Sequence, residues 1–235
     1  MPFSQAYALP SYAPTDVSGL TDANVRSLID TVAIGFDHHA YSPAMPMGIM
    51  LGVDVGVDFS VLTLPSEFTN AMKASGASSS LPSVLALPRL NVHKGLPAAI
   101  DIGFSYFGYQ SNSLIGADVK WAFIRGSMIS PSVALRVSGN LNRLFFMTTR
   151  TYDVDLVISK RVVLIFNPYV GGGLQFINGN INVPPGLTVS SQESTTTTHV
   201  YVGLPIRLGF IKLSPEYDYS AKGISTYGGK FSLSF

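Results

Sequence analysis

His38 and His39 follow Asp37, and this short run contains three side chains that could bind a metal ion or move a proton. A metal site needs further ligands at suitable spacings, and adjacent ligands without another partner are a weak metal signal. Histidine near the end of a helix also interacts favourably with the helix dipole. We therefore interpret the run as a polar cluster that ends a helix, and the sequence predicts no metal or cofactor site.

His199 could act as a general base towards a neighbouring hydroxyl group. Tyr201 occupies the place where a His-x-Ser pair would have its nucleophile, so a solvated polar residue at a rim is the simpler interpretation. The glycine run 171–173 lacks the following helix that a phosphate-binding loop requires, and within a strand it indicates a bend or a close approach. The sequence predicts a protein that is not an enzyme.

The longest regular element is the stretch 47–61, in which apolar residues occupy every odd position from Met47 to Val61. A period of two predicts a strand with one apolar face and one polar face. Fifteen residues would span roughly 50 Å at about 3.3 Å each, and transmembrane barrel strands need such length.

The same alternation recurs to the end of the chain and predicts an all-β fold, an antiparallel transmembrane β-barrel of about ten strands after an N-terminal amphipathic helix. Residues 1–46 form the arm and helix, and residues 47–235 form the barrel. The expected strands are 47–61, 84–93, 98–110, 113–125, 131–142, 146–159, 162–177, 196–210, 211–220 and 227–235.

Composition agrees with a membrane barrel. Charged residues make up 12% of the chain and the mean hydropathy is +0.31, whereas about a quarter of the residues of a soluble protein are charged. The net charge of +1 gives no reason to expect a nucleic-acid partner. Cysteine is absent, which excludes disulfides and thiolate sites. The first residues show no signal peptide, so we expect a mature form with an added methionine.

An amphipathic helix is expected after Thr21, which is placed to cap it. Its apolar face could cover the barrel lumen, the barrel wall and lipid, or a neighbouring subunit. The residues that form this face recur at helical spacing: Val25, Leu28, Ile29, Val32 and Phe36.

Charged residues fall almost entirely on the polar parity of the strands, because a charge on the lipid face costs roughly 2–4 kcal/mol at the bilayer midplane. Only Arg150 falls on the apolar side. We expect mixed signs to pair inside a largely closed lumen, although inward glycines leave room for water or an inserted helix. The expected lumen-lining residues are Asp54, Asp58, Arg89, Asp101, Asp118, Lys120, Arg136, Asp153, Asp155, Arg207, Glu216, Asp218 and Lys230.

Long connections near 64–83 and 178–195 fall at one end of an up-and-down barrel, and short connections fall at the other. Outer-membrane barrels have long loops outside and short turns on the periplasmic side. The pattern therefore predicts that the N-terminal helix and the C-terminus both lie at the periplasmic end.

The last nine residues resemble the C-terminal strand of bacterial outer-membrane β-barrels, which the barrel assembly machinery reads during insertion. The matching positions are Tyr227, Gly228, Phe231, Leu233 and Phe235, with Lys230 in place of the usual glycine. A short helix before a small glycine-rich barrel is also similar in layout to the PopA-type barrels of predatory bacteria. That resemblance implies homo-oligomeric rings that enclose lipid.

Three functions are compatible with these patterns. The first is a non-enzymatic outer-membrane barrel that forms homo-oligomers and organises or encloses membrane lipid. The second is a passive, porin-like channel for small solutes. The third is a soluble lipid carrier with its apolar faces turned inward, since parity does not say which face lies inside.

Overall fold

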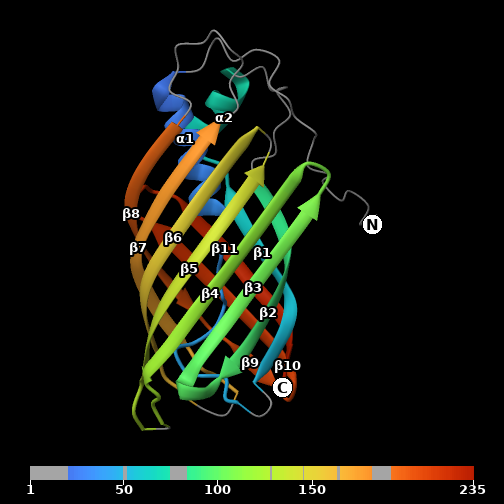
Figure 1. Cartoon of the computed structure of the whole chain (residues 1–235), viewed down its shortest axis with the longest axis vertical. Helices are drawn as coiled ribbons and strands as arrows, with labels where there is room; N and C mark the ends of the chain where they lie inside the picture. Colours follow the sequence, from blue (N-terminus) through green and yellow to red (C-terminus); the bar gives the residue numbers. More distant parts are fainter. Residues whose placement is uncertain are drawn as a thin grey trace.

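A computed structural model describes residues 21–49, 52–74, 84–127, 129–144, 146–162, 165–181 and 192–235. The strands form one closed antiparallel barrel (Figure 1). Their bounds are β1 Val53–Thr63, β2 Val84–Leu96, β3 Ile100–Tyr109, β4 Asn112–Ile124, β5 Ser132–Leu144, β6 Met147–Ser159, β7 Tyr169–Ile181, β8 Gln192–Gly203, β9 Ile206–Leu208, β10 Ile211–Ser220 and β11 Ser225–Ser234.

Ten strand positions make up the barrel, because β8 and β9 occupy one position between them. β8 pairs with β10 over residues 216–220, and β9 pairs with it over residues 211–213. The interruption falls at Leu204 and Pro205, where proline cannot donate a ladder hydrogen bond. The first and last strands close the barrel through the β1–β11 pairing, in which Val57 lies opposite Phe231. The predicted fold class and strand number are confirmed.

Two predicted strands begin too early. β1 starts at Val53 rather than at residue 47, because residues 36–49 lie before it and connect it to the helix. Residues 162–168 are not part of β7, since the Val162 amide donates to the Phe166 carbonyl in a turn and Pro168 follows. Apolar alternation alone did not distinguish this turn from a strand.

Helix α1 (Asp22–Gly35) begins as predicted, with the Thr21 hydroxyl accepting a hydrogen bond from the Asn24 amide at 3.3 Å. A second helix, α2 (Ser66–Ala74), lies in the connection that the sequence interpretation left without structure. Phe68, Ala71 and Met72 have helical spacing and are buried against the same cluster as α1. A short 3₁₀ turn, η1 (Pro97–Ala99), joins β2 to β3. None of the helices in the described residues is long and apolar enough to cross a membrane.

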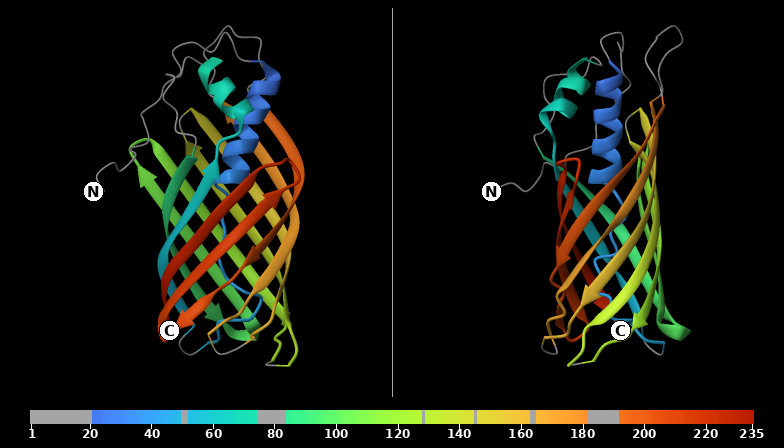
Figure 2. Two further views of the ribbon diagram at one scale, coloured as in Figure 1. Left: turned by 180° about the vertical axis from the view of Figure 1, so that it is seen from behind. Right: turned by 90° about the vertical axis from the view of Figure 1, so that its left-hand side faces the viewer.

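Both α-helices lie at the upper end of the barrel, where the connections after β1 and β7 also lie (Figure 2). The C-terminus lies at the lower end, with the β2–β3 and β4–β5 turns. The prediction that the helix shares an end with the C-terminus is therefore wrong. The chain enters at the upper end, descends through the lumen and starts β1 at the lower end, which a period-two pattern cannot reveal.

The apolar faces of the strands point outward, and the polar faces point inward. Val55, Val137, Leu156 and Val200 are among the large exposed apolar residues, whereas Asp54, Asp58, Arg136 and Asp155 are buried. The interior contains an apolar cluster around α1 and α2 at the upper end and a polar lumen below it.

Candidate functional site

Residues 36–47 run inside the barrel from the end of α1 towards the start of β1, and we call this segment the plug (Figure 2). Every plug residue from Phe36 to Ser42 is buried. Polar groups of the plug bind to eight strands of the wall. The pairs are Asp37 with Thr151 and Gln175, His38 with Ser105 and Asp118, His39 with Glu216, the Ala40 carbonyl with Lys230, Tyr41 with Ser60, Ser42 with Arg136, the Pro43 carbonyl with Lys120, and the Met47 amide with Asp101.

Glycines of the wall make the room that the plug occupies. A Cβ at Gly116 would lie 2.6 Å from Nδ1 of His38, and one at Gly228 would collide with the Tyr41 hydroxyl. A side chain at either position would have to displace the plug, because contacts this short do not occur between real atoms. The inward glycines therefore leave room for an inserted segment. That segment is the plug, while α1 fills the upper mouth.

The α1 face predicted from its spacing lies inside its own barrel. Val25, Leu28 and Ile29 are fully buried, and Val32 and Phe36 are nearly so. Asn142 of β5 donates to the Val32 carbonyl at 3.4 Å, and Asn140 donates to the Phe36 carbonyl at 2.8 Å. Of the three targets left open by the sequence, this face contacts the lumen.

The predicted lumen residues are all buried except Arg207. Arg207 pairs across β9 and β10 with Lys212, so the two residues lie on the same face of the wall. Arg207 is exposed because it lies at the lower rim, next to the Ser234 carbonyl to which it donates at 3.0 Å. Its strand parity agrees with the prediction, but it does not line the packed interior.

Buried charges of the wall are paired. Arg89 lies 3.1 Å from Asp58, and Lys120 lies 2.9 Å from Asp101. The remaining pairs involve residues on separate strands: Asp54 with Lys212 and Lys230, and His199 with Asp155 and Asp218. Unpaired buried charge is costly, so these pairs keep the narrow interior compatible with folding. Sequence reasoning did not single out Lys212 or His93, although both have the inward parity of their strands.

His199 is not at a solvated rim, contrary to the sequence interpretation. It is buried, and its two ring nitrogens each lie 2.9 Å from a carboxylate, one of Asp155 and one of Asp218. A histidine with both nitrogens occupied has no nitrogen left for a substrate. The ring acts as a bridge between β6, β8 and β10.

His38 and His39 also differ from the expected helix-ending cluster, because both lie beyond α1 in the plug. His38 Nε2 and His93 Nε2 lie 2.7 and 3.0 Å from the same Asp118 oxygen, and these three side chains could in principle hold a metal ion. His93 Nδ1, however, lies 3.4 Å from Nζ of Lys230, which can only donate. A metal on Nε2 would require a proton on Nδ1, facing another donor. Neutral histidines that donate to Asp118 satisfy the geometry without a metal.

At the upper mouth, outside the strands, Asp30 of α1 accepts a hydrogen bond from Lys222 at 2.5 Å. Burial raises the pKa of Asp30, although the neighbouring ammonium group opposes that increase. This contact connects α1 to the turn between β10 and β11. The helix is therefore fixed at its upper part as well as at its lower end.

The C-terminal residues that resemble an assembly signal lie in β11, which pairs with both β1 and β10. Tyr227, Phe231, Leu233 and Phe235 are exposed on the outer surface, and Gly228 contacts the plug at Tyr41.

No protein family and no curated protein matches the sequence. Three solved structures illustrate the similarity found at low scores. The N-terminal β-barrel domain of Pseudomonas aeruginosa OprF is 15% identical, with a TM-score of 0.36 over 77% of this chain and 97% of that one. Ail of Yersinia pestis is 11% identical, with a TM-score of 0.35 over 79% and 98%. The Acinetobacter baumannii outer membrane protein Omp33 is 7% identical, with a TM-score of 0.32 over 79% and 98%.

Proposed function

We propose that this chain is an integral, non-enzymatic β-barrel of a bacterial outer membrane that acts through its lipid-facing surface and organises or encloses membrane lipid as a homo-oligomer. The observation that carries the proposal is the combination of a lumen filled by the plug with an apolar outer wall. A barrel of this kind offers its outside, rather than its inside, to other molecules.

The outer wall supports a position in the membrane. Exposed apolar side chains occur on every long strand, for example Val55, Ile102, Val119 and Leu213. Exposed arginines on the strands, Arg143 and Arg150, lie near upper strand ends. A charge in the middle of the lipid face would cost roughly 2–4 kcal/mol, and this cost falls towards the interfaces.

Aromatic residues mark the two proposed interfaces. Tyr106, Tyr109 and Tyr152 are exposed towards the upper end, and Trp121 and Phe123 are exposed towards the lower end. Such belts anchor a barrel at the level of the lipid headgroups. Of the other aromatic residues predicted for these belts, Phe210 and Phe235 are exposed near the lower end, Phe107 and Phe166 are only partly exposed, Phe146 packs in the interior cluster, and Phe145 lies outside the described residues.

The lower end, with its short turns and the C-terminus, faces the periplasm in this proposal, and the helices face outward. The β11 residues Tyr227, Gly228, Phe231, Leu233 and Phe235 present an alternating pattern that the barrel assembly machinery would bind during insertion. That machinery is a proposed partner only during assembly.

A soluble lipid carrier is excluded by the direction of the strand faces. Such a carrier would turn its apolar residues inward, whereas Val137 and Val154 are exposed and Arg136 and Asp155 are buried. A passive channel is disfavoured because the plug and α1 occupy the lumen. Steady conductance steps from the intact chain in planar bilayers would support the channel and contradict the closed lumen.

A groove on the outer wall supports an interaction with lipid. β2 pairs with β3 only below Leu90 and Tyr106, although both strands continue above that point. Pro88 lacks an amide hydrogen and lies beside the resulting groove of about 230 Å³. Its walls are mainly apolar, and they would accept part of an acyl chain.

The α1 face does not hold subunits together, because it is buried in its own barrel. Contacts between subunits would therefore use the outer wall. Native mass spectrometry after extraction in mild detergent tests this proposal. A defined multiple of the 25.1 kDa chain with retained lipid would support it, and a lipid-free monomer across a range of protein concentrations would contradict it.

A further inference from the structure

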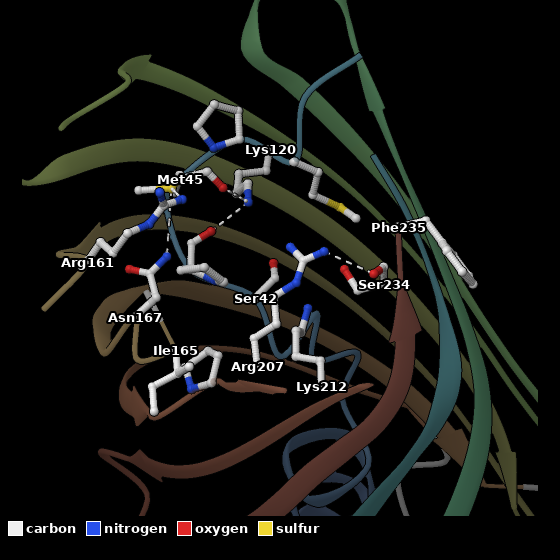
Figure 3. A pocket seen from close by; sticks show the side chains of 14 residues that line it. Ser42, Met45, Lys120, Arg161, Ile165, Asn167, Arg207, Lys212, Ser234 and Phe235 are labelled. Atoms are coloured by element: carbon white, nitrogen blue, oxygen red, sulfur yellow. Dashed lines mark hydrogen bonds between the residues drawn. The ribbon is translucent and has the colours of Figure 1, made fainter. Parts of the chain in front are cut away.

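A cavity of about 160 Å³ lies at the lower mouth of the barrel, between the plug and the ends of the strands (Figure 3). Lys120, Arg161, Arg207 and Lys212 line it, and its other described lining residues are apolar or neutral. Figure 3 shows Arg161 on one side of the cavity and Arg207 and Lys212 on another. The cavity therefore has cationic groups on more than one side and no acidic side chain in its described lining.

The lysines are only partly neutralised by the wall. Lys120 pairs with Asp101 at 2.9 Å. Lys212, however, shares Asp54 with Lys230, at 2.7 and 3.0 Å. Two carboxylates thus face three ammonium groups, and one positive charge remains at this level of the lumen.

The two arginines have no carboxylate partner among the described residues. Arg161 donates to the thioether sulfur of Met45, which is a weak acceptor. Arg207 donates to the carbonyl oxygens of Gly209 and Ser234 at 3.0 Å. Both guanidinium charges therefore add to the excess around the cavity.

We propose that this cavity binds a phosphate group. Guanidinium forks match phosphate oxygens in geometry and form strong charge-assisted hydrogen bonds with them. An excess of positive charge on several sides favours an anion with more than one charge over a single carboxylate. Pro43, Met45, Ile165 and Pro205 supply an apolar wall that would accept a short organic part of the ligand.

The phosphate could come from a lipid headgroup or from a soluble phosphate compound. Phe235 lines the cavity and is also exposed on the outer wall, which places the opening near the proposed headgroup level. The chemistry of binding is the same for both sources. The site does not depend on the proposed oligomer or on lipid enclosure, so it can fail independently of them.

The test is titration of the full-length protein in non-ionic detergent with inorganic phosphate at constant ionic strength, followed by isothermal titration calorimetry. The test variant is Arg161→Gln/Arg207→Gln, and the matched control is Arg150→Gln, on the outer surface far from the cavity. We expect saturable binding by the wild type and the control, weakened at least about tenfold in the double variant. Absence of saturable binding, or equal binding by a folded double variant, would overturn the site.

Native mass spectrometry of the same samples distinguishes the two sources. A retained phospholipid that inorganic phosphate displaces from the wild type would support the site and identify a lipid headgroup. Saturable phosphate binding without a retained phospholipid would support the site and identify a soluble ligand. Phospholipid that the double variant retains as strongly as the wild type, with no phosphate competition, would count against the site.

Discussion

Arg136 of β5 donates from Nη2 to the carbonyl oxygen of Ser42 in the plug at 2.8 Å, across a sequence separation of 94 residues. The same guanidinium group also donates to the Tyr201 hydroxyl of β8 at 3.3 Å. A buried charge of the wall is thus satisfied partly by a segment that belongs to no strand. Wall and plug are mutually dependent, because each leaves buried polar groups without partners if the other moves.

The pair of His39 in the plug and Glu216 in β10, 2.8 Å apart, should contribute strongly to stability. Glu216→Gln should lower the free energy of unfolding by about 3–5 kcal/mol, since removing one partner leaves the other buried without its charge. His39→Asn should also destabilise, and the double variant should cost less than the sum. Reversible urea unfolding in detergent micelles measures these values. Additive effects would show that the pair is not coupled.

Gly116 should tolerate no side chain while the plug is in place. Gly116→Ala should lower the free energy of unfolding by about 1–3 kcal/mol, because its Cβ would lie 2.6 Å from His38. Gly139→Ala is the control, since its nearest neighbour would be 3.6 Å away. Thermal unfolding of both variants in one detergent makes the comparison. Equal, small effects would mean that His38 does not occupy this position.

Val137 should face hydrocarbon. Val137→Arg should reduce the free energy of folding into lipid vesicles by about 2–4 kcal/mol, as expected for a charge at the midplane. Ile129→Arg, in the exposed β4–β5 turn, should have an effect near zero. Equilibrium folding into vesicles over a urea series gives both numbers. A neutral effect at Val137 would argue against lipid on that face.

Asp30 should make folding more favourable at acidic pH. Burial raises its pKa in the folded chain above the unfolded value of about 3.9. The folded state then binds the proton more tightly, so the contribution of Asp30 to stability rises as pH falls through the folded pKa and levels off near pH 4. Compared with Asp30→Asn, the wild type should gain stability between pH 7 and pH 4. A difference that stays constant or changes in the opposite direction would contradict this pKa shift.

The strands were predictable because each follows a local rule. Alternation between apolar and polar residues identifies β5, for example, where Val133, Leu135 and Val137 lie on one parity and Arg136 on the other. The same rule placed the buried charges inside. It extended one strand too far at residues 162–168, where Pro168 and a turn interrupt the ladder but the apolar alternation continues.

The plug was not predictable, because its interactions are all long-range. Its polar residues have no period, and Asp37 finds its partner Thr151 at a separation of 114 residues. Helical spacing identified the buried face of α1 but not the surface that covers it. Inward glycines indicated free space, yet only the structure shows that His38 and Tyr41 fill it.

The central claim is that the lumen is closed by the chain's own residues 36–47. The chain has no native cysteine, so Ala40→Cys, a small change at a buried plug position, can be probed alone with a water-soluble maleimide. Ile129→Cys, in the exposed turn, sets the rate for free access. We expect the folded Ala40→Cys protein to react at least a hundredfold more slowly than Ile129→Cys and equally fast once unfolded in urea, for an opening free energy of about 3 kcal/mol or more. Similar rates in the folded state would show that water reaches the plug and would contradict the closed lumen.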